Sequence, residues 1–162
     1  MNGADAICQA RAGAGGLSGT YRAWLSDDTG SPSTRFGCTA ATCSGQGYRL
    51  PDAAQTLIAT NWTDLTDGSL IHAISVTELG GTVPPDPDPA ARAWSNTAVD
   101  GTVRTDVPAD DLACVKWTFV GDPPTAGVFG GMGAANATDP TWTVEGSSPC
   151  GVPRRLYCFQ QA

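Results

Sequence analysis

Apolar residues in this chain come in short groups that predict one helix near the start and a series of short strands after it. Ala6, Ile7, Ala10 and Ala14 recur at helical spacing, which predicts a short helix over Ala4–Gly13. Asp5 falls in its first turn and Gly15-Gly16 follow it, and glycine commonly ends a helix.

Later segments combine β-branched and aromatic residues in short runs, a composition typical of strands. The predicted strands are Thr20–Leu25, Tyr48–Leu50, Leu70–Val76, Ala93–Ser95, Cys114–Phe119, Thr141–Thr143 and Arg155–Phe159. Short strands, one early helix and long connections together indicate an α+β fold. We expect one domain over residues 1–162, since the chain contains neither an internal repeat nor a linker.

The connections have distinct compositions. Asp52–Ile58 has helical composition and predicts a helical turn, and Ala59–Asp67 predicts a compact loop closed by Asp67-Gly68. Gly80–Pro89 contains alternating prolines, which exclude a helix or a central strand and predict an extended surface loop. Gly121–Asp139 is rich in Gly, Ala and Pro and predicts a further long loop.

Charge narrows the range of partners. Only 15% of the residues are charged, and nine basic against sixteen acidic residues give a formal charge of −7. A broad polyanion-binding face is therefore disfavoured, which argues against nucleic acid and heparin-like partners. The apolar runs are too short to span a bilayer.

Six cysteines predict disulfides in an oxidising compartment. A metal site is the alternative, but the chain lacks Cys-x-x-Cys and His72 is its only histidine. Four residues separate Cys38 from Cys43, a spacing that suits a small disulfide loop. Met1–Gln9 lack the basic and apolar regions of a signal peptide, so we expect a mature exported domain cut from a longer precursor, with Met1 added for expression.

Several segments resemble endostatin, the collagen-derived fragment. The first are Ala4–Ala12 and Gly16–Ser26. The second resembles the endostatin run Gly-Leu-x-Gly-Thr-Phe-Arg-Ala-Phe-Leu-Ser, with Tyr21 and Trp24 at its two Phe positions. The resemblance continues through Asn61–Gly68, Ala93-Trp94-Ser95 with Asp100-Gly101, Cys114–Trp117, and Cys150 with Arg155–Phe159. A bacterial family of unknown function, found in secreted and lipid-anchored surface proteins, is similar in the same places.

The resemblance implies a C-type-lectin-like fold with nested disulfides, in which Cys8 pairs with Cys158 and Cys114 with Cys150. Cys38–Cys43 has no counterpart in endostatin and is assigned from proximity alone. Endostatin's zinc site uses N-terminal histidines, which this chain lacks, and its heparin affinity depends on clustered arginines, which are scattered along this sequence. Neither activity is carried over.

The residues provide little catalytic chemistry. His72 lies in an apolar run and favours a structural or surface role, and a nucleophile elbow is absent. Asp86 and Asp88 in the proline-rich loop are candidates for a weak calcium site, but a third ligand is not evident. We therefore expect neither a cofactor nor a metal, and we expect no enzymatic activity.

The tryptophans divide into two groups. Trp24, Trp94 and Trp117 fall in segments matched to strands and are expected in the core. Trp62 and Trp142 lie nearer loops, where side chains can be exposed, so they are the better candidates for ligand contact. The leading hypothesis is a secreted or cell-surface recognition module that binds a protein or carbohydrate through its loops. The alternative is a structural tip or subunit domain of an extracellular assembly or filament.

Overall fold

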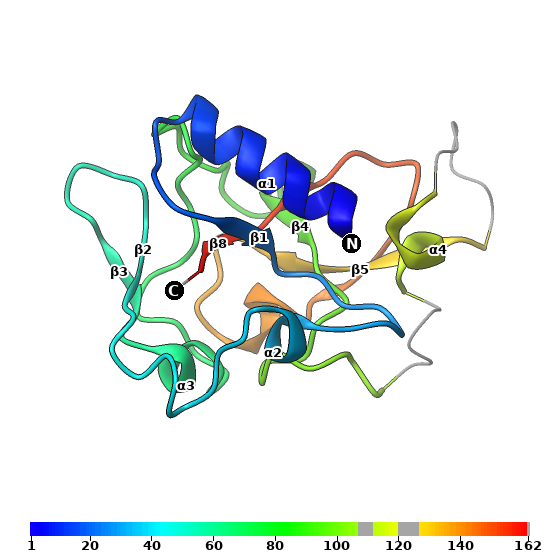
Figure 1. Cartoon of the computed structure of the whole chain (residues 1–162). Coiled ribbons are helices and arrows are strands. Elements are labelled where there is room, and N and C mark those ends of the chain that lie inside the picture. The colour runs from blue at the N-terminus through cyan, green and yellow to red at the C-terminus, as the bar shows by residue number, and fades with distance from the viewer. Residues whose placement is uncertain (107–111, 120–126, 162) are drawn as a thin grey trace.

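The two ends of the chain meet in an antiparallel strand pair. In the computed structural model, which describes residues 1–106, 112–119 and 127–161, β1 (Tyr21–Ala23) pairs with β8 (Cys158–Gln160). Helix α1 (Asn2–Ala14) lies across β1 (Figure 1). Two side chains of α1 bind the strand, since Asp5 Oδ1 accepts from the Ala23 amide and Gln9 Oε1 from the Tyr21 amide, each at 2.9 Å.

Strands from the second half of the chain form a four-stranded sheet with the strand order β6-β5-β4-β7. Its strands are β4 (Arg92–Trp94), β5 (Phe129–Ala134), β6 (Gly146–Pro149) and β7 (Arg155–Leu156). β4 pairs antiparallel with β5 and parallel with β7, so the last strands lie beside the middle of the chain. The helical elements of this half are α4 (Cys114–Trp117) and the 3-10 helices η1 (Pro89–Ala91) and η2 (Pro140–Trp142).

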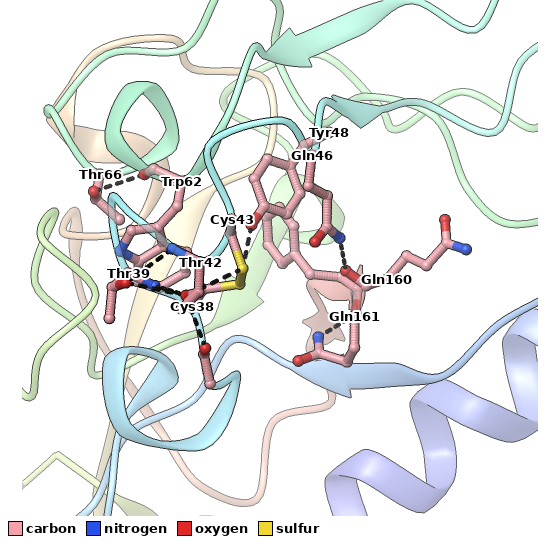
Figure 2. The surroundings of a disulfide bond; sticks show 12 residues. Cys38, Thr39, Thr42, Cys43, Gln46, Tyr48, Trp62, Thr66, Gln160 and Gln161 are labelled. Atoms are coloured by element: carbon pink, nitrogen blue, oxygen red, sulfur yellow. Dashed lines mark hydrogen bonds between the residues drawn. A yellow bond between two sulfur atoms is a disulfide. The ribbon is translucent and has the colours of Figure 1, made fainter.

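A separate antiparallel pair, β2 (Tyr48–Arg49) and β3 (Leu57–Ala59), stands beside the first pair, with an irregular register between Tyr48 and Arg49. The short helix α3 (Trp62–Leu65) contacts β3, while α2 (Pro32–Arg35) belongs to the connection between β1 and β2 (Figure 1). The Cys38–Cys43 disulfide faces the Tyr48 hydroxyl, and the side-chain amide of Gln46 donates to the carbonyl of Gln160 at 2.9 Å (Figure 2). This contact ties the β2–β3 pair to the end of the chain.

All three predicted disulfides are present: Cys8–Cys158, Cys114–Cys150 and Cys38–Cys43. The α+β class is also confirmed, as are the early helix, the Tyr48 strand and the strands near the C-terminus. Among the described residues, no helix has the length and apolar character needed to cross a membrane.

Aromatic side chains form the main core. Trp24 is fully buried at its centre, and its ring centroid lies 5.0 Å from that of Trp142 and 5.5 Å from that of Phe159. Trp24 Nε1 donates to Thr143 Oγ1 at 2.8 Å, so the indole is satisfied without water. Trp94 and Trp117 pack instead against a smaller cluster around the Cys8–Cys158 disulfide.

Several predicted elements are wrong. Asp52–Ile58 is a turn followed by β3 rather than a helical turn, and Ala59–Asp67 contains α3. Leu70–Val76 is not a strand, and Thr141–Thr143 lies in and after η2. Of the loop expected over 121–139, residues 121–126 lie outside the described part of the chain, and 129–134 form β5.

Cys114–Phe119 was predicted as a strand, but the structure shows a left-handed turn there. Cys114, Val115, Lys116 and Trp117 all have φ between 47° and 60°. Tertiary contacts hold this conformation, since the Trp117 ring packs on Trp94 and its Nε1 donates to the Ser26 carbonyl at 3.0 Å. Strand propensity is easily overridden by such packing.

The left-handed turn predicts a stabilising substitution at Val115, which is 56% exposed and has φ 54°. A left-handed conformation costs an L-residue roughly 1–2 kcal/mol, and a β-branched one is the least suited to it. Val115→Gly should therefore raise the free energy of unfolding by about 1 kcal/mol, after the entropy that glycine adds to the unfolded chain. Val115→Ala keeps the Cβ and should gain less. Urea denaturation of both variants tests this, and a destabilised glycine variant would contradict it.

Candidate functional site

A cavity of about 510 Å³ opens between α1, the β2–β3 pair, segment 74–83 and the last two strands. This volume lies within the range of small-molecule binding sites. We call it the basic cavity, because four arginines line it: Arg11, Arg49, Arg154 and Arg155. Its elements come from both ends of the chain, so the β1–β8 pair and the Cys8–Cys158 disulfide hold the walls together.

The floor of the basic cavity is aromatic and aliphatic. Strand alternation explains part of it, because Tyr48 and Leu50 are buried while Arg49 between them is exposed. Tyr157 and Phe159 alternate in the same way around Cys158. The floor side chains that the site uses are Tyr48, Leu50, Ile58, Val76, Tyr157 and Phe159.

The two floor tyrosines direct their hydroxyls into the protein. Tyr157 donates to the carbonyl of Trp142 at 2.7 Å, and the Tyr48 oxygen lies 3.8 Å from Cys38 Sγ (Figure 2). Burial raises the pKa of Tyr48 to about 12 and the pKa of Tyr157 well above its ordinary value. Both phenols therefore remain neutral at physiological pH.

The rim combines apolar and charged groups. Ile7 and Arg11 on α1 are both exposed at the mouth. Arg11 forms an ion pair with Glu78 that joins α1 to segment 74–83. Among the described residues, Glu78 is the single acidic one in a lining that contains four arginines.

The other lining arginines donate to uncharged groups. Arg49 donates to the Gln55 carbonyl at 2.8 Å, and Arg155 donates to the Ala90 carbonyl at 2.7 Å. Arg154 donates to the Pro89 carbonyl at 2.7 Å and to Ser148 Oγ at 3.0 Å. Its Nε is buried and lacks a hydrogen-bond partner within the described structure. Burial, with the nearby charge of Arg92, lowers the pKa of Arg154.

Trp62 and Trp142, the candidates for ligand contact from the sequence, are buried. Their exposed fractions are 6% and 0%, and neither belongs to the cavity lining. Both lie in short helices and pack on Trp24 in the core. Asn61 caps α3 by accepting from the Asp64 amide, and Asp139 caps η2 by accepting from the Thr141 amide. Neither ring is therefore available at the surface, which removes the reason for choosing them as candidates for ligand contact.

The side chains of His72, Asp86 and Asp88 form hydrogen bonds or an ion pair within the protein. The exposed His72 donates from Nδ1 to the Leu57 carbonyl at 2.9 Å, because a carbonyl oxygen only accepts. Asp86 forms an ion pair with Arg92, and Asp88 caps η1 by accepting from the Ala90 amide at 2.7 Å. Across residues 1–106, 112–119 and 127–161, His, Cys, Asp and Glu side chains form no group of three that could hold a metal ion.

Sequence reasoning missed the basic cavity. Its arginines belong to α1, β2 and the segment before and in β7, and only Arg154 and Arg155 adjoin in sequence. The folded chain brings scattered charges to one site, and their spacing in the sequence gave no signal of this. Neither a protein-family model nor a curated protein sequence matches the chain.

Proposed function

We propose that this chain is a secreted or cell-surface recognition module that holds a ligand, or one group of a larger ligand, in the basic cavity. The cavity carries the proposal, since an apolar hollow with a few polar groups at its rim is the usual form of a binding site. Three disulfides fit an extracellular location, where oxidising conditions keep such bonds formed. The proposed role is non-enzymatic.

We further propose that the domain is endostatin-like, with a C-type-lectin-like fold. Two features support this: the nested Cys8–Cys158 and Cys114–Cys150 bridges stand where the resemblance implies them, and both ends of the chain pair in one ladder. The fold leaves the function open. In this proposal the ligand contacts α1 and β2, whereas the sequence suggested protein or glycan binding through loops.

Blocking the cavity mouth should abolish binding. Ile7 is 54% exposed on α1 and lines the cavity, so Ile7→Trp should obstruct the entrance without disturbing the core. Ala6 is exposed on α1 and is not among the lining residues, and at 100° per residue it points to the opposite side of the helix from the centre of the lining face. Ala6→Trp is therefore a matched control.

The measurement is a binding array of glycans, surface proteins and small molecules, run on the wild type and both variants, with and without calcium. The expected result is at least one ligand that Ile7→Trp loses and Ala6→Trp retains. Equal binding by both variants would place the site elsewhere. Calcium-dependent sugar binding would favour a lectin-type site instead.

A further inference from the structure

The polar groups of the cavity floor are already engaged, so the floor presents mainly carbon surface to an occupant. Tyr157 donates its hydroxyl to the Trp142 carbonyl, and the Tyr48 oxygen faces Cys38 Sγ. Leu50 and Ile58 add aliphatic surface, each 4% exposed. A sugar ring placed here would bury hydroxyls without partners, which is costly. A hydrocarbon or aromatic body has no such cost.

Most arginines without an ion pair to a described residue lie at the cavity rim. Outside the cavity, Arg35, Arg92 and Arg104 each form an ion pair with a carboxylate. Around the cavity only Arg11 has such a partner among the described residues, although the chain carries sixteen acidic residues. Arg49, Arg154 and Arg155 therefore gather three guanidinium groups without an ion pair to a described residue around one cavity, with Glu145 offsetting part of the charge of Arg154. Arg22, outside the cavity, also lacks an ion pair among the described residues, but it stands alone.

From the apolar floor and these arginines we infer that the basic cavity takes a small anionic amphiphile, a free molecule with a hydrocarbon or aromatic body and one acidic head group. This inference rests on the proposed function and names its ligand class. The body occupies the floor beside Tyr48, Leu50 and Ile58. The head group lies at the rim, where Arg49 is exposed and its guanidinium suits a carboxylate or sulfate.

Four ten-carbon probes test the head group, each used below its micellar concentration: decanoate, decyl sulfate, decanol and decyltrimethylammonium. Titration calorimetry gives the affinities, and methyl NMR shifts of Leu50 and Ile58 report whether a probe occupies the cavity. Decanoate and decyl sulfate should bind about tenfold more tightly than decanol, a typical effect of one charge-assisted hydrogen bond. The cationic probe should bind most weakly.

Two variants of the rim should move the decanoate affinity in opposite directions. Arg49→Gln should reduce it to near that of decanol. Glu78→Gln removes the acidic group and frees Arg11 from its ion pair. The decanoate affinity should therefore rise about threefold, a change in the range of a surface ion pair. Decanol should bind both variants as it binds the wild type.

The outcomes separate the ligand class from the site. Equal binding of decanol and decanoate, with shifts at Leu50 and Ile58, would overturn the anionic head group and leave a binding cavity. Failure of all four probes to shift these methyls would overturn the amphiphile, and the Ile7→Trp comparison would then decide whether the cavity binds anything. Preferential binding to anionic phospholipid vesicles over free decanoate would overturn the free ligand in favour of a membrane surface.

Discussion

Removing the Cys8–Cys158 disulfide should lower the free energy of unfolding by about 5 kcal/mol, the largest loss among the three bridges. The bond joins residues 150 positions apart, and in the chain-entropy account a cross-link stabilises more when it closes a longer loop. A domain of this size has a total stability of roughly 5–15 kcal/mol. The double variant Cys8→Ala/Cys158→Ala should therefore lose about a third or more of the total stability.

The two other disulfides supply matched controls within the same chain. Cys38–Cys43 spans 5 positions and Cys114–Cys150 spans 36, so the same entropy relation gives losses of about 2 and about 4 kcal/mol for their alanine pairs. Each of the three double variants removes two sulfur atoms, so the loss of packing around the former disulfide is similar in kind for all three. Urea denaturation with linear extrapolation measures each loss. Equal losses for the 5- and 150-residue bridges would contradict the chain-entropy explanation.

The Cys8–Cys158 variant also tests the site, because this bridge anchors α1, which forms one wall of the basic cavity. The β1–β8 ladder would still join the two ends, through the Tyr21–Gln160 and Ala23–Cys158 register. We expect any ligand that Ile7→Trp displaces to bind this variant more weakly even under conditions where it remains folded, as judged by circular dichroism.

Local patterns predicted the parts of the fold that depend on neighbouring residues. The helical spacing of Ala6, Ile7 and Ala10 predicted α1, and proximity predicted the Cys38–Cys43 bridge. A helix-capping pattern in the sequence also predicts α3. Asn61 followed by Asp64 is a helix-start signal, and it begins the helix that buries Trp62.

The basic cavity could not be predicted in this way, because its properties arise from residues distant in sequence. Arg11 and Arg154 lie 143 positions apart by their numbers, yet they line one volume. The sequence shows a net charge of −7 and no basic cluster, whereas the fold gathers half of the eight arginines. Which carboxylates pair with which arginines depends on tertiary structure, and that pairing creates the positive rim.

Glycine was the most misleading signal. Residues 129–134, Phe-Gly-Gly-Met-Gly-Ala, are typical of a flexible loop in composition, but they form β5 at the centre of the four-stranded sheet. Their glycines permit close approach of other backbone segments. A Cβ at Gly131 would lie 2.9 Å from the Cα of Asn96, and one at Gly130 would lie 2.6 Å from Cys114 Sγ.

Gly133→Ala should therefore destabilise the protein by more than about 3 kcal/mol, at the upper end of overpacking effects. Its Cβ would lie 2.0 Å from the Trp142 carbonyl oxygen and 2.7 Å from the Thr143 Cα. Both are backbone atoms of a buried segment, so relief requires the segment to move. Gly13→Ala on α1 is the matched control, because no heavy atom lies within 4 Å of its Cβ position. That variant should gain roughly 0.5–1 kcal/mol, since alanine favours a helix.

Both substitutions change glycine to alanine, so they restrict the unfolded chain equally and the difference between them isolates the clash in the folded state. Urea denaturation should separate the two variants by more than about 3.5 kcal/mol, the sum of the opposite effects above. A Gly133→Ala variant within about 1 kcal/mol of the wild type would show that β5 and η2 can separate without cost. The clash also has a consequence for the cavity floor, because the Trp142 carbonyl that it displaces accepts the Tyr157 hydroxyl. Where Gly133→Ala remains folded, that hydroxyl loses its partner, and the variant should bind cavity ligands more weakly than Gly13→Ala does.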